Sequence, residues 1–125
     1  MKKLLLAAAI LAATLAAQTN YEVYGIRYAT LKDFSVAGLV AGADKSRKMD
    51  IAMYVWLIKG GGKNILFDSG FYREKFIARW HPADFQKPSD ALQRAGLKPE
   101  DITDVIISHI HWDHADGFED RKSVV

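Results

Sequence analysis

The sequence contains no cysteine among its 125 residues. Disulfide bonds are therefore excluded, even if the protein is exported to an oxidising compartment. A bound metal ion would have to be held by histidine, aspartate or glutamate, because no thiolate is available as a ligand. The sequence also has no internal repeat, and its length allows at most one domain.

The chain has little net charge. It carries 17 Lys and Arg against 15 Asp and Glu residues, and two of the basic residues, Lys2 and Lys3, lie at the extreme N-terminus. Without these two the count is 15 against 15, and no basic stripe is visible in the sequence. We therefore expect no nucleic-acid partner.

The longest apolar run, Leu4–Ala17, is too short to span a bilayer, which takes about 20 residues. A short basic start precedes this run and polar residues follow it, an order typical of a secretory signal peptide. We predict a signal peptide over residues 1–17, cut after Ala17 or alternatively after Ala16, and a mature portion over residues 18–125. Export to the periplasm or the medium would follow, with no membrane partner after cleavage.

Strand patterns dominate the first half of the mature portion. Aromatic and β-branched residues predict a strand over Tyr21–Thr30, and the next segment, Lys32–Lys48, lacks periodicity and is predicted to be a loop. The segment Met49–Lys59 is apolar on both faces, as in a strand buried on both sides. Its aromatic residues Tyr54 and Trp56 are therefore expected in the core.

A glycine triplet, residues 60–62, separates this strand from Lys63–Gly70. Glycine accepts positive φ, so the triplet permits a tight reversal and predicts a β-hairpin. Asp68 would stand where the returning strand ends. The following residues, Phe71–Lys87, are predicted to be partly helical.

A further helix is predicted with Ser89 as its N-cap, Asp90 in its first turn and Gly96 at its end. The branched apolar residues of Asp104–Ser108 then predict a buried strand. The order strand, helix, strand indicates an α/β fold with parallel neighbouring strands.

The stretch "ISHIHWDH" begins within that last strand and contains three of the four histidines. His109, His111, Asp113 and His114 follow the strand directly, where α/β folds bind ligands. Imidazole nitrogens and a carboxylate oxygen suit zinc, iron or manganese. We therefore predict that these four residues bind metal, whereas His81 is interpreted as a capped or solvated residue.

The segments "HIHWDHADG" and "ILFDSG" together resemble the metallo-β-lactamase superfamily. The run from Pro88 to Gly117 most resembles the N-acyl homoserine lactonase-like branch. The resemblance implies a four-layer αββα fold, of which this chain would supply the first half: a β-hairpin, a helix, a strand and a metal-binding loop.

The resemblance also implies roles. His109 and His111 would bind a first cation, Asp113 and His114 a second, and Asp68 would orient the site by hydrogen bonds. Zinc is the expected metal, with iron or manganese as alternatives.

Three further positions near the signature carry expectations. Trp112 is expected to pack rather than to react, and Ser69 is a mild change from the threonine more common in the family. Asp116 departs from the family pattern, in which many relatives have His-Ala-Gly-Gly, and we expect it to cap the following turn rather than to contact the site.

The expected chemistry is hydrolysis. Two cations lower the pKa of a shared water, and the resulting hydroxide attacks a carbonyl, with Asp113 as the catalytic carboxylate that accepts the proton. The favoured small-molecule substrate is a lactone, on branch resemblance alone, and thioesters and β-lactams remain alternatives. The aromatic side chains that could line a substrate pocket, although as a class they are more often core, are Tyr54, Trp56, Phe71, Tyr72 and Trp80.

The family places its remaining metal ligands downstream of this signature, and the sequence stops at Val125. We therefore expect a fragment of a longer hydrolase, inactive by itself. A competing interpretation is a non-catalytic half-domain with an incomplete metal site, and a weaker one is an exported metal-binding protein without enzymatic activity. The oligomeric state is not indicated by the sequence.

Overall fold

The computed structural model describes residues 19–120, so the predicted signal peptide lies outside the described residues. None of the helices within 19–120 is long and apolar enough to cross a membrane. The four strands are β1 (Glu22–Ser35), β2 (Lys48–Gly60), β3 (Lys63–Phe67) and β4 (Asp104–Ile106). The α-helices are α2 (Glu74–Trp80), α3 (Pro88–Ala91) and α4 (Trp112–Ala115), with 3-10 turns η1 (Val36–Gly38), η2 (Leu92–Ala95), η3 (Pro99–Asp101) and η4 (Asp116–Asp120).

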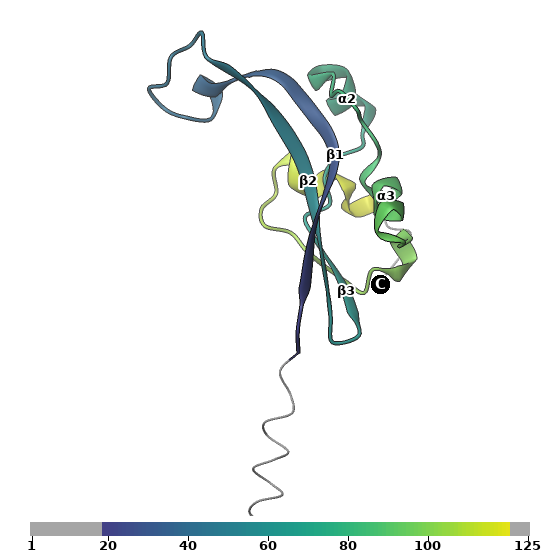
Figure 1. Cartoon of the computed structure of the whole chain (residues 1–125). Helices are drawn as coiled ribbons and strands as arrows, with labels where there is room; N and C mark the ends of the chain where they lie inside the picture. The colour runs from purple at the N-terminus through teal and green to yellow at the C-terminus, as the bar shows by residue number, and fades with distance from the viewer. Residues whose placement is uncertain (1–18, 121–125) are drawn as a thin grey trace, which may run out of the picture.

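The strands form one sheet in the order β1-β2-β3-β4. The first two pairs are antiparallel, and β3 pairs with β4 in parallel. A parallel pair needs a long crossover, which here contains α2 and α3, and both helices lie on the same side of the long β1–β2 hairpin (Figure 1). The expected α/β fold with parallel neighbours is confirmed.

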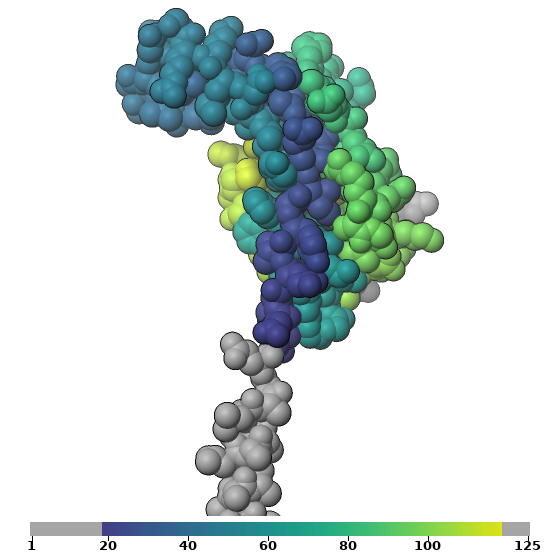
Figure 2. All heavy atoms as spheres, viewed as in Figure 1, coloured from purple at the N-terminus to yellow at the C-terminus, as the bar shows by residue number. Residues whose placement is uncertain are grey.

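The β1–β2 hairpin is longer than predicted. β1 continues through Lys32 to Ser35, which are four residues of the predicted loop. Register shifts interrupt its pairing with β2 after Arg27 and after Leu31. Such bulges add residues to one strand and hide the period of two on which a strand prediction rests. The loop joining the two strands protrudes from the rest of the molecule (Figure 2).

The glycine turn is as predicted. β2 ends at Gly60, and Gly61 and Gly62 adopt φ of 58° and 75° before β3 begins at Lys63. Positive φ is the conformation in which glycine is favoured over residues with a Cβ. β3 then ends at Phe67, so that Asp68 stands directly after the strand, as expected.

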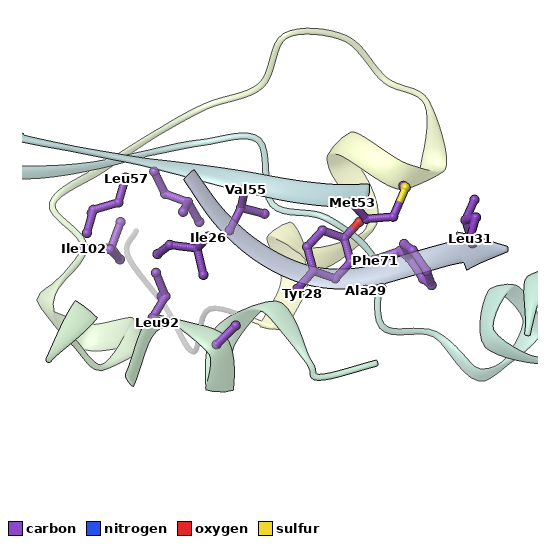
Figure 3. Packing of buried hydrophobic residues seen from close by; sticks show 12 residues of the cluster. Ile26, Tyr28, Ala29, Leu31, Met53, Val55, Leu57, Phe71, Leu92 and Ile102 are labelled. Carbon is purple, nitrogen blue, oxygen red and sulfur yellow. The ribbon is translucent and has the colours of Figure 1, made fainter. Parts of the chain in front are cut away.

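One sheet face carries the core, and Figure 3 shows its side chains packed between the sheet and the helical segments. Inward residues alternate along β2, whereas β1 buries residues 28–31 in succession, and both strands meet Leu92 and Ile102 from the crossover. The largest fully buried side chains are Tyr28, Phe71, Leu57, Ile102 and Val55. Phe71 is thus a core residue rather than a pocket residue.

The opposite face of β2 is exposed, which contradicts the prediction for this strand. Tyr54 and Trp56 stack on each other with 5.8 Å between ring centroids, and they are 43% and 44% exposed. Their predicted core position is therefore wrong for the described residues. A strand that is apolar on both faces is able to be buried on both. Within residues 19–120, however, only one face of β2 is covered.

Two predictions for the crossover and the last strand also need correction. Ser89 is not the N-cap: Lys87 is, and Pro88 opens α3, because its missing N–H costs nothing in the first turn. Gly96 does end the helical segment, with φ of 71°. β4 covers three residues only and is not buried, since Ile106 is 46% exposed.

Candidate metal centre

The predicted metal ligands lie in residues 107–116, called the histidine loop from here on. The loop starts where β4 ends, at the same edge of the sheet as the end of β3, because these two strands are parallel. The backbone N–H of Asp68 extends the pairing by donating to the carbonyl of Ile106 at 2.8 Å. The α/β topology therefore brings Asp68 beside the histidine loop, as ligand sites in such folds require.

The three imidazoles of the histidine loop are in mutual contact through His109. Its ring centroid lies 4.0 Å from that of His114 and 4.6 Å from that of His111. The Nε2 atom of His109 lies 3.1 Å from Nδ1 of His111. Two nitrogens bound to one tetrahedral zinc are about 3.3 Å apart, given bonds of roughly 2.0–2.1 Å, so this pair has the spacing of two ligands of one cation.

Asp113 and His114 form a second pair. The Nε2 atom of His114 lies 3.4 Å from Oδ2 of Asp113, again close to the separation of two ligands on one cation. The other ring nitrogen of His114, Nδ1, lies 2.7 Å from Oδ2 of Asp68. A carboxylate only accepts hydrogen bonds, so Nδ1 of His114 donates to Asp68, and Nε2 is the ring nitrogen that faces Asp113.

Asp68 is buried, and its backbone is in the left-handed region with φ of 60°. Its carboxylate accepts hydrogen bonds from the backbone N–H of Ser108 at 2.8 Å and from the Ser108 hydroxyl at 3.0 Å. Burial raises the pKa of the Asp68 carboxyl, but the bonds from His114 and Ser108 outweigh burial and hold that pKa below its ordinary value. Asp68 is therefore an anionic acceptor beside the imidazoles.

Ser108 extends the same network to His109. Its hydroxyl donates to Asp68, and Nδ1 of His109 lies 3.0 Å from the hydroxyl oxygen, which accepts the imidazole proton. His109 thereby keeps a lone pair on Nε2, the atom that faces His111. Ser108 is not among the residues predicted from the sequence, although a hydroxyl directly before the first histidine was the available signal.

Trp112 lies between the two pairs in sequence and packs away from them. Its ring stacks on Trp80 at 5.4 Å and on Phe76 at 4.9 Å, both from α2, and meets Phe71 edge-on at 4.8 Å. The expectation that Trp112 packs is confirmed. Trp80 accordingly belongs to this aromatic cluster.

Asp116 does not cap the following turn, so that expectation is wrong. Its carboxylate oxygen Oδ2 accepts the backbone N–H groups of Tyr72 and Arg73, each at 3.1 Å, and Oδ1 pairs with Nε of Arg73 at 3.0 Å. The 68–73 segment folds back against the end of the histidine loop, a long-range contact that residue spacing does not reveal.

Two more backbone contacts join the same segments. The carbonyl of His114 accepts the backbone N–H of Ser69 at 2.7 Å and the Ser69 hydroxyl at 3.0 Å. The N–H of Gly117 donates to the carbonyl of Gly70 at 2.8 Å. Ser69 therefore has a positioning contact that its sequence pattern alone did not show.

His81 lies apart from the histidine loop in sequence. It ends α2 with its N–H bound to the carbonyl of Ile77, and it is exposed.

A cleft of about 300 Å³ adjoins the second pair. Asp113 and His114 form one side, and the other side consists of residues on β2, namely Ile51, Ala52, Met53, Tyr54 and Trp56. The exposed aromatic pair of β2 thus faces the same space as two predicted ligands. Tyr72 and Trp80 do not contribute to this cleft.

Within residues 19–120, no group of three or more His, Asp or Glu side chains is arranged to hold one metal ion. The donors converge as two pairs instead, His109 with His111 and Asp113 with His114. A zinc ion in a protein takes three or four protein ligands. The donor types suit zinc, and each pair brings two donors together.

Comparison with known proteins places these features in a family. The profile of the metallo-beta-lactamase superfamily matches residues 52–120, more than half of the chain. The N-acyl homoserine lactonases AiiB of Agrobacterium fabrum (strain C58 / ATCC 33970) and of Rhizobium rhizogenes (strain K84 / ATCC BAA-868) are each 34% identical over 83 residues. The matched part covers 56% of this chain and 30% of each lactonase, so the chain spans less than a third of these curated relatives.

Solved structures show the same partial fold. An N-acyl homoserine lactone hydrolase with the product N-hexanoyl-L-homoserine at its catalytic metal centre superposes with a TM-score of 0.64 at 18% identity, over 83% of this chain and 46% of that chain. A probable metal-dependent hydrolase from Staphylococcus aureus superposes with a TM-score of 0.57 at 20% identity, over 78% of this chain and 40% of that chain. AidC, described as a dizinc quorum-quenching lactonase, gives a TM-score of 0.53 at 21% identity, over 78% and 35%.

Proposed function

The chain belongs to the metallo-β-lactamase superfamily, and on this premise we propose that it forms the histidine-loop half of a metal-dependent hydrolase. The observation that carries the proposal is the contact of the His109, His111 and His114 imidazoles at the end of β4, with the Asp113 carboxylate beside His114. Three imidazoles and a carboxylate that share one exposed edge form a donor set suited to zinc.

His109 and His111 would hold one cation, and Asp113 and His114 the other. Asp68 supports this assignment because it fixes the proton of His114 on Nδ1, and Ser108 does the same for His109. In both imidazoles Nε2 is then the nitrogen that would bind metal, the arrangement by which hydrogen-bonded partners orient histidine ligands. Zinc is the proposed metal, and iron or manganese would suit the same donors.

When bound, two cations supply Lewis acidity and lower the pKa of water, which is the chemistry of ester and amide hydrolysis. The residues of this chain would place the donors and carry the proton. Asp113 is the candidate for the proton acceptor, because its carboxylate is half-buried at the pair with His114 and borders the cleft.

For the substrate we propose a lactone. The support is the likeness to proteins named N-acyl homoserine lactonases, two of them at 34% identity. Thioesters and β-lactams are the alternatives, since the signature of the histidine loop does not select among acyl substrates. A small-molecule substrate agrees with the cleft of about 300 Å³, which lies at the lower limit of the range for ligand sites.

A second candidate function follows from a specific observation. Each donor pair provides two ligands, and within residues 19–120 no third group joins either pair. A chain with only these donors would bind zinc weakly and would not turn over substrate. A non-catalytic metal-binding protein is therefore the alternative to the hydrolase.

We also propose that the protein is exported, which is checked by sequencing the N-terminus of the protein recovered from the periplasm.

The test is a zinc titration of the whole chain combined with an assay of N-acyl homoserine lactone, thioester and β-lactam hydrolysis. Binding of two zinc ions with lactone turnover would support the hydrolase in this chain. Weak binding without turnover would favour the non-catalytic alternative. The control variant His81→Ala lacks the one histidine outside the loop, so any change in its zinc affinity would count against the proposed ligands.

A further inference from the structure

The histidine loop is attached to α2 and to the residues directly before it, at two points that flank Asp113 and His114. Trp112, directly before Asp113, stacks on Phe76 and Trp80 along the face of α2. Asp116, two residues after His114, binds the backbone immediately before the start of α2. The predicted ligands of the second cation therefore lie between an anchor on α2 and an anchor on the residues that lead into it.

The Asp116 anchor is buried and fully engaged. Only 3% of its side chain is exposed, against 40% for Arg73, its ion-pair partner. A buried carboxylate is costly unless it is paired and hydrogen-bonded. Here one oxygen accepts two backbone N–H groups and the other meets the guanidinium of Arg73, so the carboxylate is satisfied only while the histidine loop keeps this position.

The contact also fixes the residues that lead into α2. The N-cap residue of this helix, Arg73, makes no side-chain capping bond. Asp116 accepts the backbone N–H of Arg73 and that of Tyr72, the residue before it, 43 and 44 positions earlier in the sequence. Moving Asp116 would thus release the segment that leads into the helix on which Trp112 packs.

Resting on the proposed function, we propose that Asp116 is a positioning residue for the second cation. Its carboxylate fixes the end of the histidine loop to the backbone of Tyr72 and Arg73 and, with the stacking of Trp112, sets where Asp113 and His114 lie. The pair His109 and His111 precedes both anchors and depends on them less.

The experiment compares three variants of the whole chain. Asp116→Ala removes the hydrogen bonds to the two N–H groups and the ion pair with Arg73. Asp116→Asn keeps an oxygen that can accept the two N–H groups. Asp50→Ala is the matched control, because Asp50 also pairs with a cation, Lys32, and accepts one backbone N–H, that of Asp33, but is half exposed on the β1–β2 hairpin.

The first readout uses the metal-free protein, so it does not depend on the hydrolase proposal. Imidazole signals in heteronuclear NMR should shift most for His114 in Asp116→Ala, less for His109, whose ring lies 4.0 Å from that of His114, and least for His111. The control should shift none of them. Equal shifts of all three histidines, or no shift of His114, would overturn the proposal. Only variants whose far-UV CD spectrum shows that they are folded are compared.

The second readout is zinc affinity, measured by competition with a chromophoric chelator. Loss of a group that orients metal ligands weakens binding by about 10–100-fold, and we expect about tenfold for Asp116→Ala, confined to one of two bound ions. Asp116→Asn should recover most of this loss. Unchanged affinity in a less stable variant would show a purely structural role and contradict the proposal. Absence of zinc binding in the parent chain would defeat the proposed function instead, and the NMR result would still decide the role of Asp116.

Discussion

Nδ1 of His114 lies 2.7 Å from Oδ2 of Asp68, although 46 positions separate the two residues in sequence. The contact joins the segment after β3 to the histidine loop after β4. It directs Nδ1 of His114 toward Asp68, so that Nε2 is the nitrogen on the side of Asp113.

Replacing Asp68 by alanine should weaken zinc binding by about 10–100-fold, because His114 and Ser108 both lose their acceptor. A zinc titration of the whole chain measures the effect. Asp44→Ala is the matched control: Asp44 likewise accepts the backbone N–H and the hydroxyl of one serine, Ser46, but is exposed in the β1–β2 loop. Equal affinities of the two variants would contradict the assigned role of Asp68.

Trp112→Ala should lower the free energy of unfolding by about 3 kcal/mol, since a large aromatic side chain is removed from a packed cluster. In this variant the rings of Phe71, Phe76 and Trp80 no longer have the indole to pack against. Trp112→Phe keeps part of the stacking and should cost about 1 kcal/mol or slightly more. Urea unfolding measures both. A smaller destabilisation in Trp112→Ala than in Trp112→Phe would show that the cluster does not hold the loop.

Gly117→Ala should destabilise the chain for a steric reason alone. A Cβ at this position would lie 2.1 Å from the carbonyl oxygen of Ser69, so the two segments would have to separate. The expected loss is about 1–3 kcal/mol. Gly38→Ala is the control, because its nearest neighbour, a side-chain atom of Phe34, would lie at an ordinary 3.5 Å. Equal thermal stability of the two variants would contradict the close approach of the segments.

Tyr28 gives the prediction for pH. Burial, and then the negative charge of Asp113, raise the pKa of the Tyr28 hydroxyl far above its ordinary value of 10.0. The raised pKa means that the folded state favours the neutral form, so the contribution of Tyr28 to stability is complete below about pH 10 and is lost as the pH rises above it.

Tyr28→Phe has no hydroxyl to ionise and should be free of this loss. The difference in free energy of unfolding between the parent chain and Tyr28→Phe should therefore shift in favour of the variant between about pH 10 and pH 11. Urea titrations at several pH values measure it. A difference that stays constant over this range would mean that the hydroxyl is accessible to water in the folded chain.

Much of the fold could be predicted because it depends on local chemistry. The glycine triplet, the short strand that ends before Asp68, and the helical end at Gly96 each follow from the backbone freedom of glycine or from strand composition. The grouping of the histidines beside the sheet edge follows from the rule that strands β3 and β4 are parallel and end together.

The errors arose where the outcome depends on distant residues. Tyr54 and Trp56 have core-like chemistry, but burial requires a second layer, and none covers them within residues 19–120. Asp116 looked like a local turn residue, whereas its partners lie 43 and 44 positions earlier. The N-cap is the exception, because it is a local matter: Ser89 has the propensity of an N-cap, but Pro88 directly before it already opens the helix.

The central claim is that His109, His111 and His114 hold cations together with Asp113. The most direct test is heteronuclear NMR of the imidazole signals of the whole chain during titration with zinc. The account predicts that the signals of these three histidines shift with added zinc while those of His81 stay unchanged. Shifts of His81 that match the other three, or no shift of the three at all, would contradict it.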